Sequence, residues 1–214
     1  KIKKRSKINK RSKIKKRSKK KSLRRAAHQT KEFVEYIFSK PNRGCFDPKM
    51  SPTEKKIMMD LVKIVSKILK KNNIKWMPIA GNLLGAYRHN SFVIPWDDDF
   101  DFIVDNKDRK RVVKILEKEL PKYHAGIIYY MPWDKIGSKL YKIYFLPNHP
   151  KYKNDIVNFK MYPYTWPFLD LFLDCMNDKK NKNKHILDHL HNIDSDDKVK
   201  PQYIEGIHTY LPSK

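Results

Sequence analysis

The sequence contains few cysteines and glycines and no long hydrophobic run. Its 214 residues include two cysteines, Cys45 and Cys175, too few for a disulfide framework or a four-cysteine zinc site. Only 6 glycines exclude a collagen-like chain, and 40% hydrophobic residues exclude a wholly disordered one. No segment approaches the roughly 18 consecutive apolar residues of a membrane-spanning helix, and no apolar stretch follows the basic N-terminus as in a secretory signal. We therefore expect a soluble or peripheral protein of a reducing compartment.

Positive charge is abundant and concentrated at the N-terminus. The formal net charge is +25, and residues 1–25 contain 11 Lys, 5 Arg and no acidic residue. Residues 1–18 are three copies of a six-residue unit (KIKKRS, KINKRS, KIKKRS), whose single Ile fits neither a helical nor a strand period. Dense like charges repel, so we predict a disordered tail over residues 1–25 and a folded domain over 26–214. The tail is either a plain solvated segment, a nuclear-localisation-like signal, or a contact for anionic lipid or nucleic acid.

The hydrophobic pattern of the remaining chain predicts alternating helices and strands. Ser51, Pro52 and Glu54 have the pattern of a capping box that opens a helix ending near Lys71. The other predicted elements are helices over 23–38, 83–89 and 108–120, and strands over 74–79, 100–104, 126–131, 139–146 and 168–174. Residues 203–211 are expected to close the sheet, and 147–166 to form a long loop near a site. This order predicts an α/β fold with a mixed sheet.

Four aspartates within five residues immediately precede an apolar strand pattern. On an extended chain alternate side chains share a face, so Asp97, Asp99 and Asp101 are expected to point one way, with Phe100 and Phe102 facing the core. Carboxylates this close repel one another unless protons or cations intervene. Because oxygen ligands favour Mg²⁺, Mn²⁺ or Ca²⁺, the segment predicts a metal site more strongly than a solvated acidic turn.

Other metal or nucleophile patterns in the sequence are weaker. An EF-hand that begins at the first of these aspartates fails, since its sixth position is Phe102 instead of Gly and its twelfth is Asp108 instead of Glu. The histidines of residues 185–191 have a spacing that zinc could use, but their polar surroundings favour a solvated helix. Cys175 ends a strand pattern, where a buried structural thiol is favoured over a nucleophile.

A glycine-containing turn precedes the aspartates. Ala80, Gly81 and Asn82 lead into a short helix that ends with Arg88 and His89. A turn of this kind at a helix N-terminus leaves backbone N–H groups available for a phosphate. A phosphate cradle followed by metal-binding carboxylates is the combination that phosphoryl transfer requires.

The segment GNLLGAYRHNSFVIPWDDDFDFIV closely resembles the signature of the LicD family, which includes bacterial phosphocholine transferases and fukutin-type proteins. Asn82 stands where that signature usually has Thr. The segment WPFLDLF around Asp170 resembles the family's second block, and residues 203–212 resemble its later Gly-to-Pro strand. The resemblance covers about residues 52–212. It implies the nucleotidyltransferase superfold related to DNA polymerase beta, in a domain truncated at its C-terminus.

The resemblance also implies roles for four carboxylates. Asp99 and Asp101 would hold Mg²⁺ or Mn²⁺, and Asp97 would be an additional ligand or a neighbour of one. Asp170 would be the third catalytic acid, which binds a second metal ion or accepts the proton of the attacking hydroxyl.

The implied substrate contacts lie in the preceding turn and helix. Gly81 and Asn82 would cradle phosphate, and Arg88, with His89 beside it, would neutralise charge on the phosphoryl oxygens. The implied activity is metal-dependent transfer of a phospho-alcohol, such as phosphocholine or ribitol phosphate, from a CDP-activated donor to a glycan hydroxyl. Two alternatives stay open: a nucleotidyltransferase that adds nucleotides to nucleic acid, and a non-catalytic polyanion-binding protein.

Overall fold

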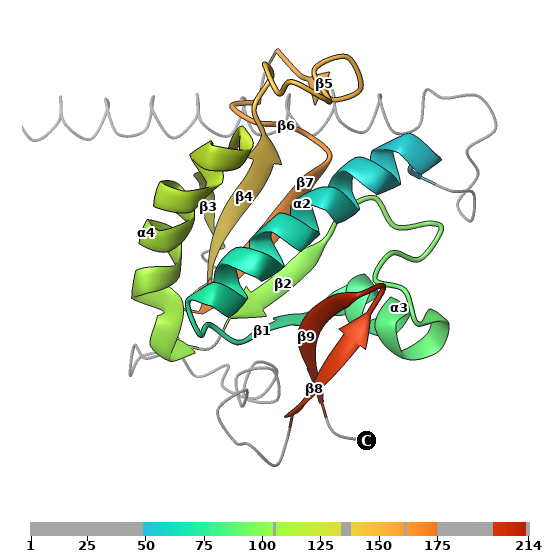
Figure 1. Cartoon of the computed structure of the whole chain (residues 1–214), viewed down its shortest axis with the longest axis vertical. Helices are drawn as coiled ribbons and strands as arrows, with labels where there is room; N and C mark the ends of the chain where they lie inside the picture. The colour runs from blue at the N-terminus through green and yellow to red at the C-terminus, as the bar shows by residue number, and fades with distance from the viewer. Residues whose placement is uncertain (1–48, 105, 134–137, 161, 175–198, 213–214) are drawn as a thin grey trace, which may run out of the picture. The chain divides into compact units, whose positions relative to one another are not determined.

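The computed structural model describes five segments of the chain, namely residues 49–104, 106–133, 138–160, 162–174 and 199–212 (Figure 1). The elements described below belong to one compact unit, formed by residues 44–158 and 164–214. Several predictions lie outside the described residues: the tail over 1–25, the helix over 23–38, the histidines of 185–191 and Cys175.

Three α-helices, two short 3₁₀ helices and nine strands make up the described part of this unit. The helices are α2 (Pro52–Lys71), α3 (Ala80–His89), α4 (Arg109–Glu119), η1 (Asn106–Asp108) and η2 (Leu120–Tyr123). The strands are β1 (Trp76–Pro78), β2 (Asp101–Val104), β3 (Ala125–Trp133), β4 (Ser138–Phe145), β5 (Val157–Asn158), β6 (Thr165–Trp166), β7 (Phe168–Asp174), β8 (Val199–Ile204) and β9 (Ile207–Pro212).

Five strands form the main sheet in the order β1-β2-β7-β4-β3. Strands β2 and β7 run parallel, whereas the other neighbouring pairs run antiparallel. Helix α2 crosses in front of β2 and β7, and α4 lies beside β3 and β4 (Figure 1). The predicted α/β class with a mixed sheet is therefore confirmed.

The predicted start of α2 is confirmed in detail. The backbone N–H of Glu54 donates to Ser51 Oγ at 3.2 Å, and the backbone N–H of Ser51 donates to Glu54 Oε2 at 2.6 Å. This capping box satisfies two N–H groups that have no partner within the helix. The hydrophobic face of α2, which includes the fully buried Ile57, Met58 and Leu61, then packs on the sheet.

An aromatic cluster supports the segment that carries the aspartates. The rings of Trp76, Phe92, Phe100 and Phe102 lie with neighbouring centroids 5.5 to 6.3 Å apart. Phe100 and Phe102 are each 1% exposed, as the alternation of the sequence predicts. Burial of these rings anchors the start of β2, where Asp101 is the first strand residue.

The prediction that residues 203–211 close the main sheet is wrong. Among the described strands, β8 and β9 pair only with each other, through a two-residue turn in which Glu205 and Gly206 both have positive φ (51° and 75°). Such a turn matches the twist of a hairpin, so local pairing satisfies these strands without the sheet. The hairpin attaches by side chains instead: Thr209 Oγ1 donates to Trp76 O at 3.2 Å, and Glu205 Oε2 accepts from Phe92 N at 3.1 Å.

Two smaller boundaries also differ from the sequence predictions. The strand expected over 74–79 is limited to β1, and α3 begins at Ala80 instead of residue 83. Ala80 has a positive φ of 49°, and this tight bend lets the helix start directly after the strand.

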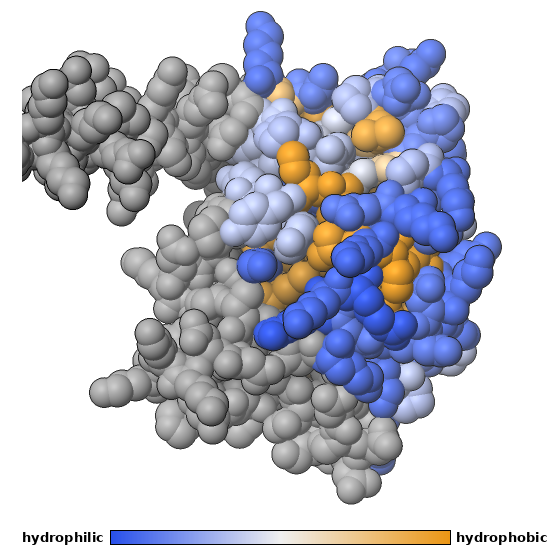
Figure 2. Space-filling view, turned by 90° about the vertical axis from the view of Figure 1, so that its left-hand side faces the viewer, coloured by the Kyte–Doolittle hydropathy of each residue, from blue (hydrophilic) through white to orange (hydrophobic). Residues whose placement is uncertain are grey.

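The surface around α4 is mainly hydrophilic. Figure 2 views the side of the molecule that carries α4, where hydrophilic side chains border smaller hydrophobic areas. This agrees with the helix itself, which buries Val112 and Leu116 and exposes Lys110 and Lys114. Among the described residues, no helix has both the length and the apolar character needed to span a membrane.

Candidate active site

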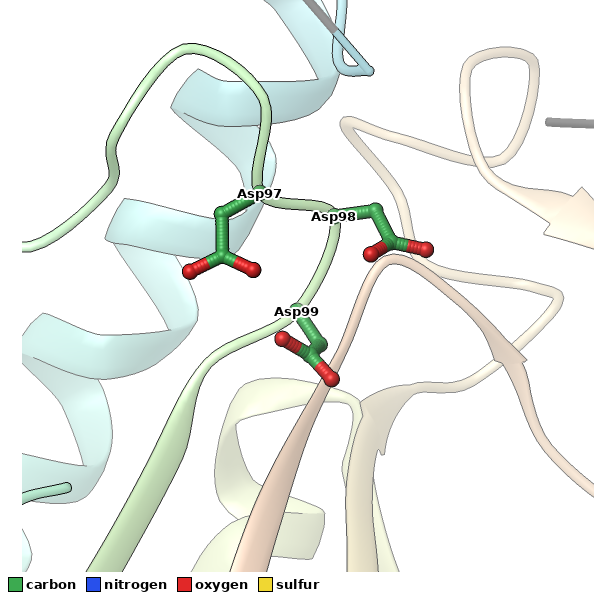
Figure 3. Close-up of side chains that lie close together, drawn as sticks. All are labelled: Asp97, Asp98 and Asp99. Atoms are coloured by element: carbon green, nitrogen blue, oxygen red, sulfur yellow. The ribbon is translucent and has the colours of Figure 1, made fainter. Parts of the chain in front are cut away.

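Residues 97–100, here called the aspartate loop, bring three carboxylates together just before β2 (Figure 3). Oxygen atoms of Asp97, Asp98 and Asp99 all lie within 4.8 Å of one another. Strand alternation would place Asp98 on the opposite side, but the chain is not a strand until Asp101, so the alternation does not apply. Asp98 is therefore a member of the cluster that the sequence analysis missed.

A second group of carboxylates joins this loop to the neighbouring strand. Asp101 on β2 lies opposite Asp170 on the parallel β7, and Asp170 N donates to Phe100 O at 2.7 Å. Oxygen atoms of Asp99, Asp101 and Asp170 lie within 4.8 Å of one another. The three acids that the sequence analysis selected as catalytic therefore share one site, although their catalytic role stays a prediction.

The environment of these carboxylates favours protonation in the absence of a cation. Burial, followed by the neighbouring charges of Asp101 and Asp97, raises the pKa of Asp99 to about 9. Burial and the charge of Asp170 raise the pKa of Asp101 to about 7. Burial also raises the pKa values of Asp97 and Asp170. The site thus concentrates negative charge that a proton or a metal ion must neutralise.

The ligand atoms fit a hard divalent cation. Asp170 is 5% exposed, and its Oδ1 is buried without a hydrogen-bond partner in the described part of the chain. An unpaired buried carboxylate oxygen is costly, and a cation would remove this cost. Carboxylate oxygens are the ligands that Mg²⁺ and Mn²⁺ prefer, so the residues present suit the predicted metal.

Lys142 is a site residue that the sequence analysis did not identify. Its Nζ lies 2.7 Å from Asp170 Oδ2, and the two side chains are 8% and 7% exposed. The strand register sets this contact, because Lys142 on β4 lies directly opposite Asp170 on β7. The sequence offered one signal, a lysine within an apolar strand pattern, but it did not identify β4 as the neighbour of β7.

The turn before α3 positions the aspartate loop. Asn82 has 0% exposure, and its Nδ2 donates to Phe92 O at 2.9 Å and to Asp99 O at 3.3 Å. Its Oδ1 accepts from Asp101 N at 2.6 Å. The polar atoms of the Asn82 side chain are therefore buried and bound to backbone, whereas phosphate binding by Gly81 and Asn82 stays a prediction.

Gly81 leaves room for a carboxylate. A Cβ added at Gly81 would lie 2.1 Å from Asp97 Oδ2, so only glycine permits this approach. Asp97 consequently sits beside the first turn of α3, where the helix dipole favours negative charge. The structure places a protein carboxylate where the sequence analysis expected a phosphate.

The loop predicted over 147–166 reaches the aspartates at its end. Trp166 Nε1 donates to Asp98 O at 3.3 Å, and the following peptide bond to Pro167 is cis. This contact ties the start of β7 to the aspartate loop.

Comparison with known proteins shows which family the sequence belongs to. The family described as LicD/FKTN/FKRP, nucleotidyltransferase domain, matches residues 73–204, which include all five clustered aspartates and Lys142. The chain belongs to this family. The resemblance stated from the signature is thus confirmed, and the domain type is that of a nucleotidyltransferase.

The relatives of this LicD-family chain match it over short regions. An uncharacterized protein of Rickettsia prowazekii (strain Madrid E) is 41% identical over 59 residues, covering 28% of this chain and 22% of the relative. An uncharacterized protein of Rickettsia typhi (strain ATCC VR-144 / Wilmington) is 41% identical over 66 residues, covering 30% and 21%. The matched part of the chain therefore spans about a fifth of the length of these relatives.

One similar solved structure is that of an antigenic nucleotidyltransferase-like protein from Paracoccidioides brasiliensis. It is 12% identical, has a TM-score of 0.42, and the match covers 75% of this chain and 62% of that chain.

Two further residues of the LicD signature lie at the C-terminal end of α3. Arg88 and His89 are exposed in the last turn of α3, whereas Asp97 contacts its first turn. Arg88 lies seven positions after Gly81 in the helix, a rise of about 10 Å. The role of Arg88 and His89 as substrate-binding residues stays a prediction.

The raised pKa values predict how the stability of this LicD-family domain depends on pH. The pKa of Asp99 is about 9 and that of Asp101 about 7, both above the unfolded value of 3.8, so the folded state holds the extra protons. Their contribution to stability is complete below pH 3.8, declines as the pH rises above this value, and is lost above about pH 7 for Asp101 and about pH 9 for Asp99. We expect the melting temperature of the metal-free protein to fall between pH 6 and 9, and Mg²⁺ to restore it.

Differential scanning fluorimetry with EDTA or MgCl₂ measures this dependence. The control is the Asp99→Asn, Asp101→Asn double variant. Its melting temperature should decline less with rising pH than that of the wild type and should not increase with Mg²⁺. If the melting temperatures of both proteins fell equally with rising pH, Asp99 and Asp101 would not be the source of the pH dependence.

Proposed function

We propose that this LicD-family domain is a divalent-metal-dependent transferase that moves a phospho-alcohol from a CDP-activated donor to a hydroxyl of a glycan. The observation that carries the proposal is the convergence of Asp99, Asp101 and Asp170, in which the buried Oδ1 of Asp170 has no hydrogen-bond partner among the described residues. Membership of the LicD family supports a transferase that acts on phospho-alcohols or glycans.

The proposed metal ligands are the three converging carboxylates. Asp99, Asp101 and Asp170 would hold Mg²⁺ or Mn²⁺, and Asp97 and Asp98 would add negative charge beside them. When bound, the ion supplies positive charge that stabilises the phosphoryl oxygens of the donor in the transition state.

The protein's own contribution is to keep these ligands in place. Asn82 binds the backbone at Asp99 and Asp101, while the parallel register holds Asp170 beside them. The aromatic cluster behind Phe100 keeps water away from one side of the loop. A rigid arrangement of this kind costs no reorganisation when the reaction occurs.

A donor panel tests the proposal. The full chain is incubated with Mg²⁺ and labelled CDP-choline, CDP-ribitol, CDP-glycerol or nucleoside triphosphates, with mixed oligosaccharides and oligonucleotides as parallel acceptors. We expect label on an oligosaccharide from one CDP-alcohol, and none when EDTA is present. Labelled oligonucleotide from a nucleoside triphosphate would instead establish the nucleic-acid alternative, and no product with any pair would favour a non-catalytic protein.

The basic tail is proposed to be an accessory segment for anionic surfaces. Deletion of residues 1–25, which removes 16 positive charges, should leave turnover on soluble substrates within about twofold. Retention on heparin, or on vesicles that contain phosphatidylserine, should weaken most at low salt because screening already reduces it at high salt. A large loss of turnover on deletion would show that the tail belongs to the catalytic unit.

A further inference from the structure

Lys142 occupies an unusual position for a lysine. Its ammonium lies 3.8 Å from the ring centroid of Phe168, 5.2 Å from that of Tyr130 and 5.8 Å from that of Tyr164. The negatively charged faces of aromatic rings attract a cation, so these three rings hold the ammonium in place. The lysine side chain is almost fully buried on the same sheet face as Asp170.

Asp170 depends on this ammonium for its side-chain orientation. Within the described part of the chain, Lys142 Nζ is the hydrogen-bond partner of Asp170 Oδ2, and Oδ1 has none. The surrounding aromatic faces do not attract a carboxylate, because their quadrupoles are negative there. A single ion pair therefore fixes the rotamer that brings Asp170 within 4.8 Å of Asp99 and Asp101.

We propose that Lys142 is a positioning residue that holds Asp170 in place as a ligand of the divalent cation. This inference rests on the proposed function, because it requires that the three carboxylates bind a cation. Lys142 does not itself touch the ion or the substrate; it acts through Asp170.

Loss of the ammonium has a definite consequence under this proposal. Without it, a buried carboxylate would face aromatic rings with no positive partner, which is unfavourable, and it would turn away or take up a proton. In either case the cation loses one ligand. A lysine that acted only as a nearby positive charge would have the opposite effect, because its removal would strengthen binding of a cation.

A double-mutant cycle on Mn²⁺ affinity separates these effects. Free Mn²⁺ is measured by electron paramagnetic resonance at one pH in the full chain carrying Lys142→Met, Asp170→Asn or both. We expect each single variant to bind Mn²⁺ at least tenfold more weakly than the wild type, and the double variant to be within twofold of Asp170→Asn. The control Lys139→Met removes an exposed lysine of the same strand and should leave the affinity within twofold.

The outcomes distinguish this inference from the proposed function. The positioning role alone would be overturned if Lys142→Met left the Mn²⁺ affinity unchanged or increased it. It would also be overturned if the losses of affinity in the two single variants added in the double variant. Absence of Mn²⁺ binding in the wild type, or binding that survives Asp99→Asn with Asp101→Asn, would overturn the metal site and the inference with it.

A conservative variant covers the case in which Lys142→Met does not fold. Lys142→Arg keeps a charged donor opposite Asp170, so affinity within fivefold of the wild type is expected. A tenfold loss in a Lys142→Arg protein with native circular dichroism and melting temperature would overturn the proposal.

Discussion

Replacement of both Asp99 and Asp101 by Asn is expected to reduce turnover at least about a hundredfold, equivalent to roughly 2.7 kcal/mol of barrier. Asparagine preserves the size of each side chain but lacks the charge that binds a divalent cation. The fold should survive, since burial and charge repulsion together raise the pKa of Asp99 to about 9, and the substitution removes the charge that both disfavour. Turnover with the active CDP-alcohol and the melting temperature in EDTA are the two measurements.

A matched control separates metal binding from a general effect of lost charge. Asp155→Asn makes the same chemical change at an exposed loop position and should leave turnover within twofold. If the double variant keeps turnover within about tenfold of the wild type, roughly 1.4 kcal/mol, these two residues do not form the metal site.

Local sequence patterns predicted those parts of the fold that local interactions determine. The capping box placed the start of α2 at Pro52, and an apolar-rich strand pattern placed β7 at its observed bounds, Phe168–Asp174. Asp99 and Asp101 could be selected from clustered carboxylates next to an apolar strand. In each case the relevant residues are close in sequence.

Features that depend on strand order could not be predicted in the same way. The contact between Lys142 and Asp170 spans 28 residues and requires β4 to lie beside β7. The separate β8–β9 hairpin has a strand pattern like that of the sheet, and its place is set by tertiary contacts such as those of Thr209 and Glu205. Sequence periodicity identifies a strand but does not identify its neighbours.

Asn82 shows the same limitation at a single residue. A small polar residue at a helix start is typical of a phosphate-binding turn, and this pattern did not reveal the bonds of the Asn82 side chain to the backbone. What decides the role is burial: all three hydrogen bonds of the side chain go to backbone at Phe92, Asp99 and Asp101. The side chain therefore fixes the main chain that carries the clustered carboxylates.

Substitution of Asn82 by Ala is accordingly expected to reduce the free energy of unfolding by about 2–4 kcal/mol, because buried backbone groups lose their partners. The expected fall in melting temperature is about 4–16 °C for a domain of this size. Mn²⁺ affinity should also weaken, since Asp99 and Asp101 lose a shared anchor. The exposed Asn154→Ala is the control and should change neither quantity measurably.

Asn82→Thr provides a graded test of the same role, because Thr is the usual residue of the family signature at this position. A hydroxyl can accept from Asp101 N and donate to one carbonyl, but it cannot make all three contacts of the amide. We expect a stability between those of Asn82→Ala and the wild type, with Mn²⁺ affinity closer to the wild type. Affinity as weak as that of Asn82→Ala in a stable Asn82→Thr protein would show that the amide does more than position the loop.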